Sequence, residues 1–386
     1  MSSRALRVIV AGAGIAGLST AAALRRKGIQ VELLESAPEL RASGSGIGVA
    51  CNATAALRSF GVDPVAAAMG RPMERFVLRT AAGVEIRTVD YRDIAAELGH
   101  PVVNMHRRDL LAGLRAAAPD VPIRFGAELK GFDLVAGGVR VTCADGYSTE
   151  GDALIGADGI RSAVRAQLTG PEPVTDHGYV CWLATAAFEH ERLASGTATH
   201  YWGAGRRFGF ADLGGGQVYW WGTSNVPGRA ADWSGGKDEI RACFAGWAPE
   251  IGAIIDRTPA AAIITVPAQD RPFLESWGSG PVTLIGDAAH PMLTSLSQGG
   301  SSAIEDACVL AHHLNTGADI ATALRDYEHA RRARTRALVT GSRDLSRVEQ
   351  LAHPLAVRLR ELAFRHAPDR FIRGRTVEPM RFALPA

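Results

Sequence analysis

A glycine-rich turn near the N-terminus constrains the fold of this chain more than any other feature. The turn Gly12-Ala13-Gly14-Ile15-Ala16-Gly17 follows a short apolar run, Arg7–Ala11, and opens an alanine-rich run, Ile15–Lys27, that stops at Gly28. A second apolar run, Ile29–Glu35, comes next. This order predicts a strand, a helix and a parallel strand, with a helix N-terminus suited to binding a pyrophosphate.

Each glycine of this turn has its own reason to lack a side chain. Gly12 permits the tight turn, Gly14 lets a pyrophosphate approach the backbone, and Gly17 lets the helix pack against the sheet. Glu35 ends the second strand, where a carboxylate accepts both hydroxyls of an adenosine ribose and disfavours a 2′-phosphate. An ordinary glycine-rich turn is the alternative, but the flanking strand, helix and acid favour dinucleotide binding.

The same N-terminal stretch imitates a secretory signal, because Arg4 and Arg7 precede the apolar stretch Val8–Leu24. The spaced glycines and the basic residues that follow argue against that interpretation. No other run is long and apolar enough to span a membrane, and the net charge of +2 gives no general attraction to nucleic acid. Five scattered cysteines without a C-x-x-C pair predict free thiols and a cytoplasmic protein.

Two further turns follow predicted strands far downstream. Gly156-Ala157-Asp158-Gly159 comes after Ala153–Ile155, and Gly286-Asp287 comes after Val282–Ile285. Gln298-Gly299-Gly300 then opens a helix with a buried face. Taken singly, each aspartate fits a turn with a helix cap. Together the three turns predict one Rossmann-like (GR2-type), discontinuous α/β domain assembled from separate pieces of chain.

The sequence between these pieces differs in composition and pattern. Residues 176–274 hold six of the seven tryptophans and several strand-like runs, which predict an inserted antiparallel sheet. Residues from Ala321 onward are helical in pattern and rich in arginine. The expected division is a dinucleotide domain in three parts (1–75, 98–175, 275–345), a substrate domain in two (76–97, 176–274) and a C-terminal helical segment (346–386).

With these motifs the chain resembles the class A flavoprotein monooxygenases, the p-hydroxybenzoate-hydroxylase-like group, over nearly its whole length. Asp158-Gly159 resembles the motif associated with FAD and pyridine nucleotide, and Gly286-Asp287 the motif whose aspartate contacts the ribityl chain. Arg107 matches an FAD-contacting arginine, and Arg41 with Gly46-Ile47-Gly48 matches the loop near the flavin ring. The FAD-binding residues so implied are Gly12, Ala13, Gly14, Ile15, Ala16, Gly17, Glu35, Arg41, Gly48, Arg107, Asp158, Gly286, Asp287, Gln298, Gly299 and Gly300.

The resemblance implies an enzyme that uses FAD, O2 and NADH or NADPH as a transient reductant, and that hydroxylates or epoxidises a small aromatic or heteroaromatic substrate through a C4a-hydroperoxyflavin. It implies a monomer or homodimer without nucleic-acid or membrane partners and without a metal. A flavin reductase or desaturase, a halogenase and an FAD-binding sequestering protein are the alternatives. The halogenase Trp-x-Trp-x-Ile-Pro signature is absent.

Within the family, the stretches Gly178–Trp182 and Phe244–Pro249 look closest to FAD-dependent urate hydroxylases and neighbouring heteroaromatic hydroxylases. By this resemblance Arg207 and Tyr219 fall on the substrate-site arginine and tyrosine and are the candidate catalytic residues. A symmetric hairpin turn at Gly214-Gly215-Gly216 would align Arg207, Gly209, Tyr219 and Trp221 on one strand face, as a cation, a gap and two rings. A structural sheet face with a buried arginine stem is the equally weighted alternative.

The chain also departs from the family pattern. Thr294 stands where proline is usual, Ser297 where glycine is common, and Cys51 where proline is usual. The first two put the orientation of the substrate in doubt, and with it urate as the substrate. The arginines Arg331, Arg334 and Arg336 match the family's closing helix, and a solvated basic face is the structural expectation for them.

Overall fold

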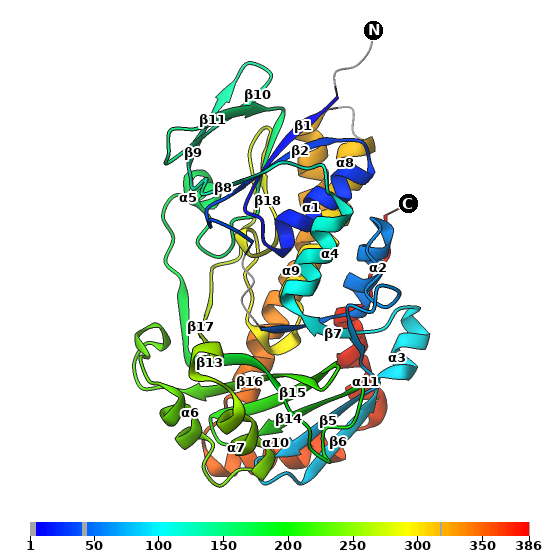
Figure 1. Cartoon of the computed structure of the whole chain (residues 1–386), viewed down its shortest axis with the longest axis vertical. Coiled ribbons are helices and arrows are strands. Elements are labelled where there is room, and N and C mark those ends of the chain that lie inside the picture. Colours follow the sequence, from blue (N-terminus) through cyan, green and yellow to red (C-terminus); the bar gives the residue numbers. More distant parts are fainter. Residues whose placement is uncertain (1–4, 41–44, 317–318, 386) are drawn as a thin grey trace.

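The computed structural model describes residues 5–40, 45–316 and 319–385. Two halves are stacked along the long axis of the molecule, and helix α9 runs from one half into the other (Figure 1). The upper half holds a parallel sheet, and the lower half holds a larger, mainly antiparallel sheet. This arrangement confirms the predicted fold class, a discontinuous α/β domain with an antiparallel-sheet layer and C-terminal helices.

The parallel sheet of the upper half has five strands in the order β18-β12-β1-β2-β8. Its strands are β1 (Arg7–Ala11), β2 (Gln30–Glu35), β8 (Ile123–Phe125), β12 (Ala153–Gly156) and β18 (Val282–Leu284). Val8 pairs with Val31 on one side and with Ala153 on the other, so the predicted βαβ unit forms the centre of the sheet. The three predicted glycine turns therefore all leave the same end of adjacent parallel strands.

Helices and a small sheet cover the two faces of this parallel sheet. Helices α1 (Ile15–Arg26), α4 (Arg107–Ala117) and α8 (Gly299–Thr316) share one apolar core with it. A three-stranded sheet made of β9 (Leu129–Val135), β10 (Gly138–Cys143) and β11 (Ser148–Gly151) contributes Val139 and Val141 to the same core. Helix α5 (Ala163–Thr169) follows β12 and packs against β9.

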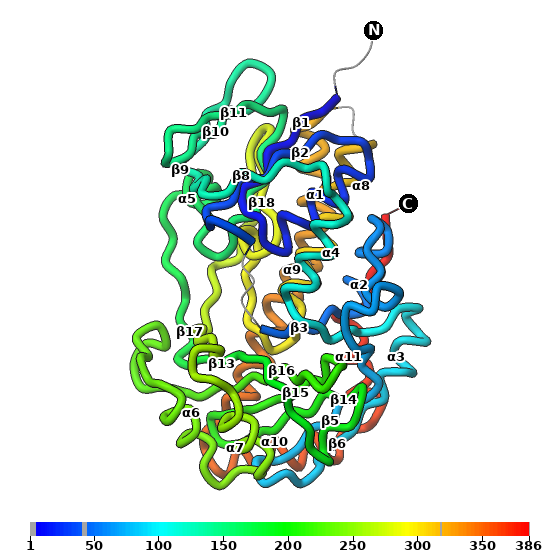
Figure 2. The backbone as a smooth tube through the Cα atoms, in the orientation of Figure 1, coloured from blue at the N-terminus to red at the C-terminus, as the bar shows by residue number. Residues whose placement is uncertain are grey.

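The lower sheet has seven strands in the order β17-β13-β16-β15-β14-β5-β6. These strands are β5 (Arg75–Thr80), β6 (Glu85–Asp90), β13 (Thr175–Ala187), β14 (Thr197–Trp202), β15 (Arg206–Gly214), β16 (Gln217–Asn225) and β17 (Ile264–Asp270). All neighbours are antiparallel except β14 and β5, which pair in parallel. The chain first adds β5 and β6 to this sheet; it enters the sheet again at β13 and leaves at β17. Thr175 of β13 pairs with Asp270 of β17, so these two later connections lie side by side (Figure 2).

One face of the lower sheet is closed by its own core. Trp182, Phe208 and Trp220 are fully buried there against α6 (Lys237–Cys243) and α7 (Pro249–Arg257). Alternate residues of the same strands point to the opposite face. That second face lies toward a small sheet of β3 (Gly46–Val49), β4 (Gly70–Pro72) and β7 (Val103–His106), which contacts β15 and β16.

The remaining elements surround these layers. They are the helices α2 (Cys51–Ser59), α3 (Tyr91–Leu98), α9 (Ile320–Glu349), α10 (Pro354–His366) and α11 (Asp369–Val377), with short 3-10 turns η1 (Ala230–Asp232), η2 (Ala260–Ala262), η3 (Gly286–Ala288), η4 (Thr294–Leu296) and η5 (Glu378–Met380). Helix α9 crosses residue 345 without a break, and the division into domains stays a prediction. All five cysteines are unpaired, as predicted.

The expected solvated face of the α9 arginines is wrong for its first member. Arg331 is 1% exposed and contacts Glu305 and Asp306 of α8 at 2.6 Å each. Arg334 pairs with Glu305 from a half-buried position. The burial of these arginines could not be predicted from helical periodicity, because the buried carboxylates that bind them lie on another helix. Arg336 alone pairs with an exposed residue, Glu275.

Across the described ranges, no helix is both long and apolar enough to cross a membrane. In the same part of the chain, no group of three or more His, Cys, Asp or Glu side chains is placed to hold a metal ion.

Candidate active site

In the glycine turn between β1 and α1, two glycines are required by the packing of the protein and one is not. A Cβ added at Gly12, where φ is +99°, would lie 2.5 Å from the Ala157 carbonyl oxygen, and one at Gly17 would lie 1.8 Å from the Gly12 carbonyl oxygen. Backbone atoms cannot move aside cheaply, so both positions require glycine. A Cβ at Gly14 would meet no protein atom within 4 Å. Gly14 therefore lacks a side chain for a reason outside the protein's own packing.

Glu35 lies at the end of β2, directly beside this turn. Its Oε2 accepts the Ala13 N–H at 2.7 Å, and its Oε1 accepts the Ala37 N–H at 2.8 Å. Each carboxylate oxygen has further lone pairs beyond these bonds. The two backbone donors thus fix the carboxylate where a ribose would lie next to a turn-bound pyrophosphate, and its ribose contact stays a prediction.

Asp158 follows β12 and is partly a helix cap. Its Oδ2 accepts the Ala163 N–H at 2.7 Å and the Val164 N–H at 3.3 Å, as the capping interpretation predicts. Its Oδ1 is buried and, within the described ranges, has no hydrogen-bond partner of acceptable geometry, although the Ser162 hydroxyl lies nearby. Burial raises the pKa of this carboxyl, and Ser162 and the backbone N–H groups only partly oppose that rise. A buried acceptor without a partner is a candidate for binding a donor on a ligand.

The third turn brings α1 and α8 together. Gly286 has φ +60°, and a Cβ there would lie 3.0 Å from Cβ of Ala16 and 3.1 Å from Cβ of Ala303. The next residue, Asp287, keeps its side chain open to solvent although protein surrounds it closely. These surroundings raise the pKa of the Asp287 carboxyl, while the charges of His290 and Arg107 oppose the rise. The Asp287 carboxylate is therefore accessible to a ligand although protein atoms surround it closely.

The N-terminus of α8 is where the predicted segments meet. A Cβ on Gly299 would lie 3.9 Å from Oδ1 of Asp287, and a Cβ on Gly300 would lie 3.0 Å from Cδ1 of Ile47 and 3.6 Å from Cδ1 of Ile15. The start of α1, the β3 strand and the turn after β18 thus converge at a single helix end. Such an end offers free N–H groups and a positive dipole to an anionic ligand.

The other predicted cofactor residues occupy the edge of this convergence. Gln298 is buried, and its Oε1 accepts a 2.9 Å hydrogen bond from Nδ2 of Asn52. Gly48 lies on β3 opposite Asn104, and the backbone N–H of Arg107 donates to the Ser45 carbonyl at 2.9 Å. Arg41 lies outside the described residues. Sequence reasoning missed Asn52, which gave no motif of its own.

The predicted alignment on the lower sheet is present. Arg207 pairs with Thr223, Gly209 with Trp221, and Ala211 with Tyr219. Directly opposite residues share a face, so Arg207, Gly209, Tyr219 and Trp221 do face the same way. The gap expected at Gly209 is filled, however, because a Cβ there would lie 2.1 Å from the Trp221 ring. The indole therefore covers this glycine, at a position between Arg207 and Tyr219 along the strands.

Arg207 and Tyr219 lie at opposite ends of this face, roughly 13 Å apart along the strands at about 3.3 Å per residue. Each contacts a segment that leads to the α8 N-terminus. The Arg207 Nη2 donates to Thr294 Oγ1 at 3.3 Å, just before α8. The Tyr219 ring lies against Gly46, where a Cβ would be 2.3 Å from its Cγ, next to Ile47.

The strongest partner of Arg207 was not predicted. Arg207 forms an ion pair with Glu349, the last residue of α9, and both side chains are buried. Burial is the largest influence on the pKa of Arg207 and lowers it, but the charge and hydrogen bond of Glu349 and the nearby Tyr179 and Cys181 together outweigh burial and raise that pKa. Burial raises the pKa of Glu349, and the charge of Arg207 opposes that rise. The pair is ionised, because a carboxylate in direct contact with a permanent cation is stabilised in its charged form.

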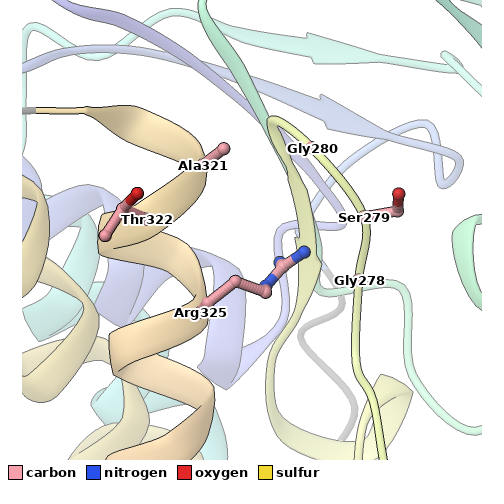
Figure 3. A pocket seen from close by; sticks show the side chains of 6 residues that line it. All are labelled: Gly278, Ser279, Gly280, Ala321, Thr322 and Arg325. Atoms are coloured by element: carbon pink, nitrogen blue, oxygen red, sulfur yellow. The ribbon is translucent and has the colours of Figure 1, made fainter.

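Two surface pockets lie away from all of these residues. One of about 480 Å³ is lined by Gly278–Gly280 and by Ala321, Thr322 and Arg325 at the start of α9 (Figure 3). In it the Arg325 side chain extends toward the loop and is already bonded to the Val282 carbonyl and to Glu328, at 2.9 and 2.6 Å. A second of about 290 Å³ lies beside Arg25 and Asp120. Neither pocket contains a predicted site residue.

These observations fit a bound dinucleotide. Gly14 leaves room beside a helix N-terminus, Asp158 has an acceptor oxygen without a partner among the described residues, and Asp287 presents an exposed carboxylate. Asp287 and Gly14 belong to segments that meet at one place, although their turns are far apart in sequence. The residues present therefore suit an elongated ligand with a phosphate near its middle and hydroxyl-bearing groups on either side.

Comparisons with known proteins agree with this site. The model of a protein family described as "FAD binding domain" matches residues 5–342. The chain is 36% identical to an aurachin C monooxygenase/isomerase of Stigmatella aurantiaca over 98% of both chains, and 31% identical to an FAD-dependent urate hydroxylase of Klebsiella pneumoniae subsp. pneumoniae over 88% of this chain and 89% of that one. The crystal structure of Klebsiella pneumoniae HpxO with FAD and uric acid superposes with a TM-score of 0.91, at 27% identity, covering 97% of this chain and 96% of that one.

Proposed function

The chain belongs to the class A flavoprotein monooxygenases, and on that premise we propose that its substrate is a small, flat aromatic or N-heteroaromatic molecule held between the lower sheet and the α8 N-terminus. The chain is an FAD-dependent monooxygenase. NADH or NADPH is the reductant typical of this family. The sequence offers no second glycine-rich βαβ unit, so we infer that the nicotinamide cofactor binds transiently in a groove.

Different cofactor residues are suited to different parts of FAD. We propose that the α1 N-terminus at Gly14 would bind the pyrophosphate, Glu35 the adenosine ribose and Asp287 the ribityl chain, and that the α8 N-terminus would offer its N–H groups and dipole to the flavin. Bound FAD supplies hydride acceptance from the nicotinamide and activation of O2. The protein's part is to bind, to orient the substrate and to keep water away.

The substrate assignment rests on one observation. Arg207 and Tyr219, at the two ends of one sheet face, contact Thr294 and Gly46, and both of these segments lead to the α8 N-terminus. A planar molecule lying over the Trp221 ring would then face the cofactor with its edges near these two side chains. Within the described part of the chain, the Tyr219 hydroxyl forms no hydrogen bond, so it is available to a polar edge of the substrate.

Two variants test these roles. Tyr219→Phe should leave the visible flavin spectrum unchanged, lower the product formed per NAD(P)H consumed and raise peroxide release, because a loosely held substrate misses its reaction. Arg207→Ala should weaken substrate binding about ten- to a hundredfold, because it removes the donor that orients Thr294 and leaves the buried Glu349 carboxylate without its partner. Tyr147→Phe is the matched control, since that hydroxyl bonds Glu32 outside the site.

The assay is an oxygen electrode combined with peroxide and product measurement on the FAD-loaded enzyme, over a panel of flat heteroaromatic compounds. A panel that never stimulates O2 uptake would argue against the proposed substrate class. Unchanged coupling and affinity in both variants would remove Arg207 and Tyr219 from the substrate site. The free cysteines further lead us to propose a cytoplasmic location; the oligomeric state, monomer or homodimer, stays a prediction.

A further inference from the structure

The charge of Arg207 is already neutralised by the protein. Its Nη1 contacts Glu349, its Nε donates to Thr223 Oγ1 at 3.3 Å and its Nη2 to Thr294 Oγ1 at 3.3 Å. Arg207 and Glu349 are each 2% exposed. Three donors of this guanidinium are therefore engaged by the protein, one of them by a carboxylate. Arg207 consequently attracts an anionic substrate less strongly than an unpaired arginine would.

The groups around this pair add no second open cation. Arg360 of α10 donates to the carbonyls of Val348 and Glu349 at 3.1 and 3.0 Å, so its charge faces the C-terminal end of α9. Cations are stabilised at that end of a helix dipole. His200, on the same sheet face, is buried and neutral, because burial and the two nearby arginines lower its pKa well below the usual range. The sheet face thus presents one buried ion pair of zero net charge.

Thr294 links the Arg207–Glu349 pair to the proposed substrate site. Its side chain is exposed, and its oxygen accepts a hydrogen bond from Arg207. A hydroxyl that accepts from a cation keeps its own proton for another partner. The Thr294 hydroxyl neighbours the Cys181 thiol and is exposed, so it can turn its proton to a carbonyl or ring nitrogen of an uncharged molecule. A carboxylate brought to the same place would find the charge of Arg207 already balanced by Glu349.

We propose that Glu349 determines substrate specificity: by pairing with Arg207 it makes the site select uncharged N-heteroaromatic substrates and reject anionic ones. This inference rests on the proposed function, because it assumes that Arg207 borders the substrate. Glu349 is a positioning and specificity residue that acts through Arg207. The pair also ties α9 to the lower sheet, so a purely structural role is the competing explanation.

The experiment compares two probes with one ring skeleton, 4-quinolone and quinoline-4-carboxylate. Each is titrated into the oxidised, FAD-loaded enzyme, and binding is read from the flavin absorbance. The wild type should bind the quinolone more tightly than the carboxylate. Glu349→Gln should tighten carboxylate binding about ten- to a hundredfold relative to quinolone binding, as expected for one freed charged donor. Glu349→Asp should keep the wild-type preference.

Two further variants separate specificity from structure. Glu250→Gln neutralises another fully buried carboxylate, paired with Arg192 and Tyr201 on the opposite face of the sheet, and should leave the probe preference unchanged. The double variant Arg207→Gln/Glu349→Gln removes both charges and should not gain carboxylate binding. A gain in that double variant, or an equal gain in Glu250→Gln, would refute the proposal.

The proposal stays refutable even if Glu349→Gln loses FAD or fails to fold. A wild type that binds the carboxylate at least as tightly as the quinolone, or that binds neither probe, contradicts it directly. A folded Glu349→Gln with an unmoved probe ratio contradicts it as well. NAD(P)H-driven O2 uptake by the same wild-type preparation reports separately on the monooxygenase function, so a failure of one is distinguishable from a failure of the other.

Discussion

Replacing Gly14 by valine should remove FAD and leave the protein folded. The backbone at Gly14 has φ −76° and ψ −166°, which any residue adopts, and an added Cβ meets no protein atom within 4 Å. Because Gly14 is the N-cap of α1, valine costs the apoprotein about 1 kcal/mol, and the lower entropy of the unfolded chain offsets about half of that. The unfolding temperature of the apoprotein should therefore hardly change.

The effect on the cofactor is much larger. A side chain at Gly14 lies where a pyrophosphate would approach the helix N-terminus, and loss of two charge-assisted hydrogen bonds costs about 3–6 kcal/mol, or roughly a hundredfold to ten-thousandfold in Kd. The assay is the flavin content of the purified variant, followed by FAD titration of both apoproteins. A folded Gly14→Val that retains a full complement of FAD would refute the placement of the pyrophosphate.

Gly17→Ala should destabilise the apoprotein itself by about 3 kcal/mol in a denaturant titration, because its Cβ would overlap a backbone carbonyl; an unchanged midpoint would contradict this. Burial alone would raise the pKa of Asp306, but the charges of His290 and Arg331 and their hydrogen bonds outweigh it and lower that pKa to about 2. This folded-state pKa lies below the unfolded value, so about 2 kcal/mol of stability is present above pH 4 and is lost as the pH falls toward 2; Asp306→Asn should flatten that acid limb of the unfolding curve. Five thiols should titrate in the unfolded chain, but Cys51 and Cys181 should react slowly in the native protein, since burial raises the pKa of each to about 11.

The parts of the fold that the sequence predicted are those with local causes. The strand predicted over Arg7–Ala11 has the same bounds in the structure, and the helix predicted over Ile15–Lys27 ends one residue earlier. Apolar periodicity and glycine spacing act within a few residues, so they are readable without the fold. The shared face of Arg207 and Tyr219 followed from one hairpin turn for the same reason.

The parts that it missed depend on distant residues. Glu349 lies 142 residues from Arg207 and carries no pattern that links it to a strand. Arg331 was predicted to lie on the surface, but in the structure it is buried against two carboxylates of α8. The Trp221 ring fills the space over Gly209 because of its rotamer, which no periodicity encodes. Buried charge pairs and ring placement are set by tertiary packing, and only the assembled fold reveals them.

The order of strands in the parallel sheet has a consequence for how the enzyme is made. The strand β12 lies between β1 and β18, and Val282 of β18 is synthesised 275 residues after Arg7 of β1. At about 5–20 residues per second, a ribosome needs roughly 14–55 s to cover that distance. Until then one edge of the parallel sheet, formed by β1 and later by β12, has no neighbouring strand, and the turn at Gly286 and Asp287 that follows β18 is missing from the cofactor site. Until β18 is added, this uncovered strand edge is open to pairing with a strand of another chain.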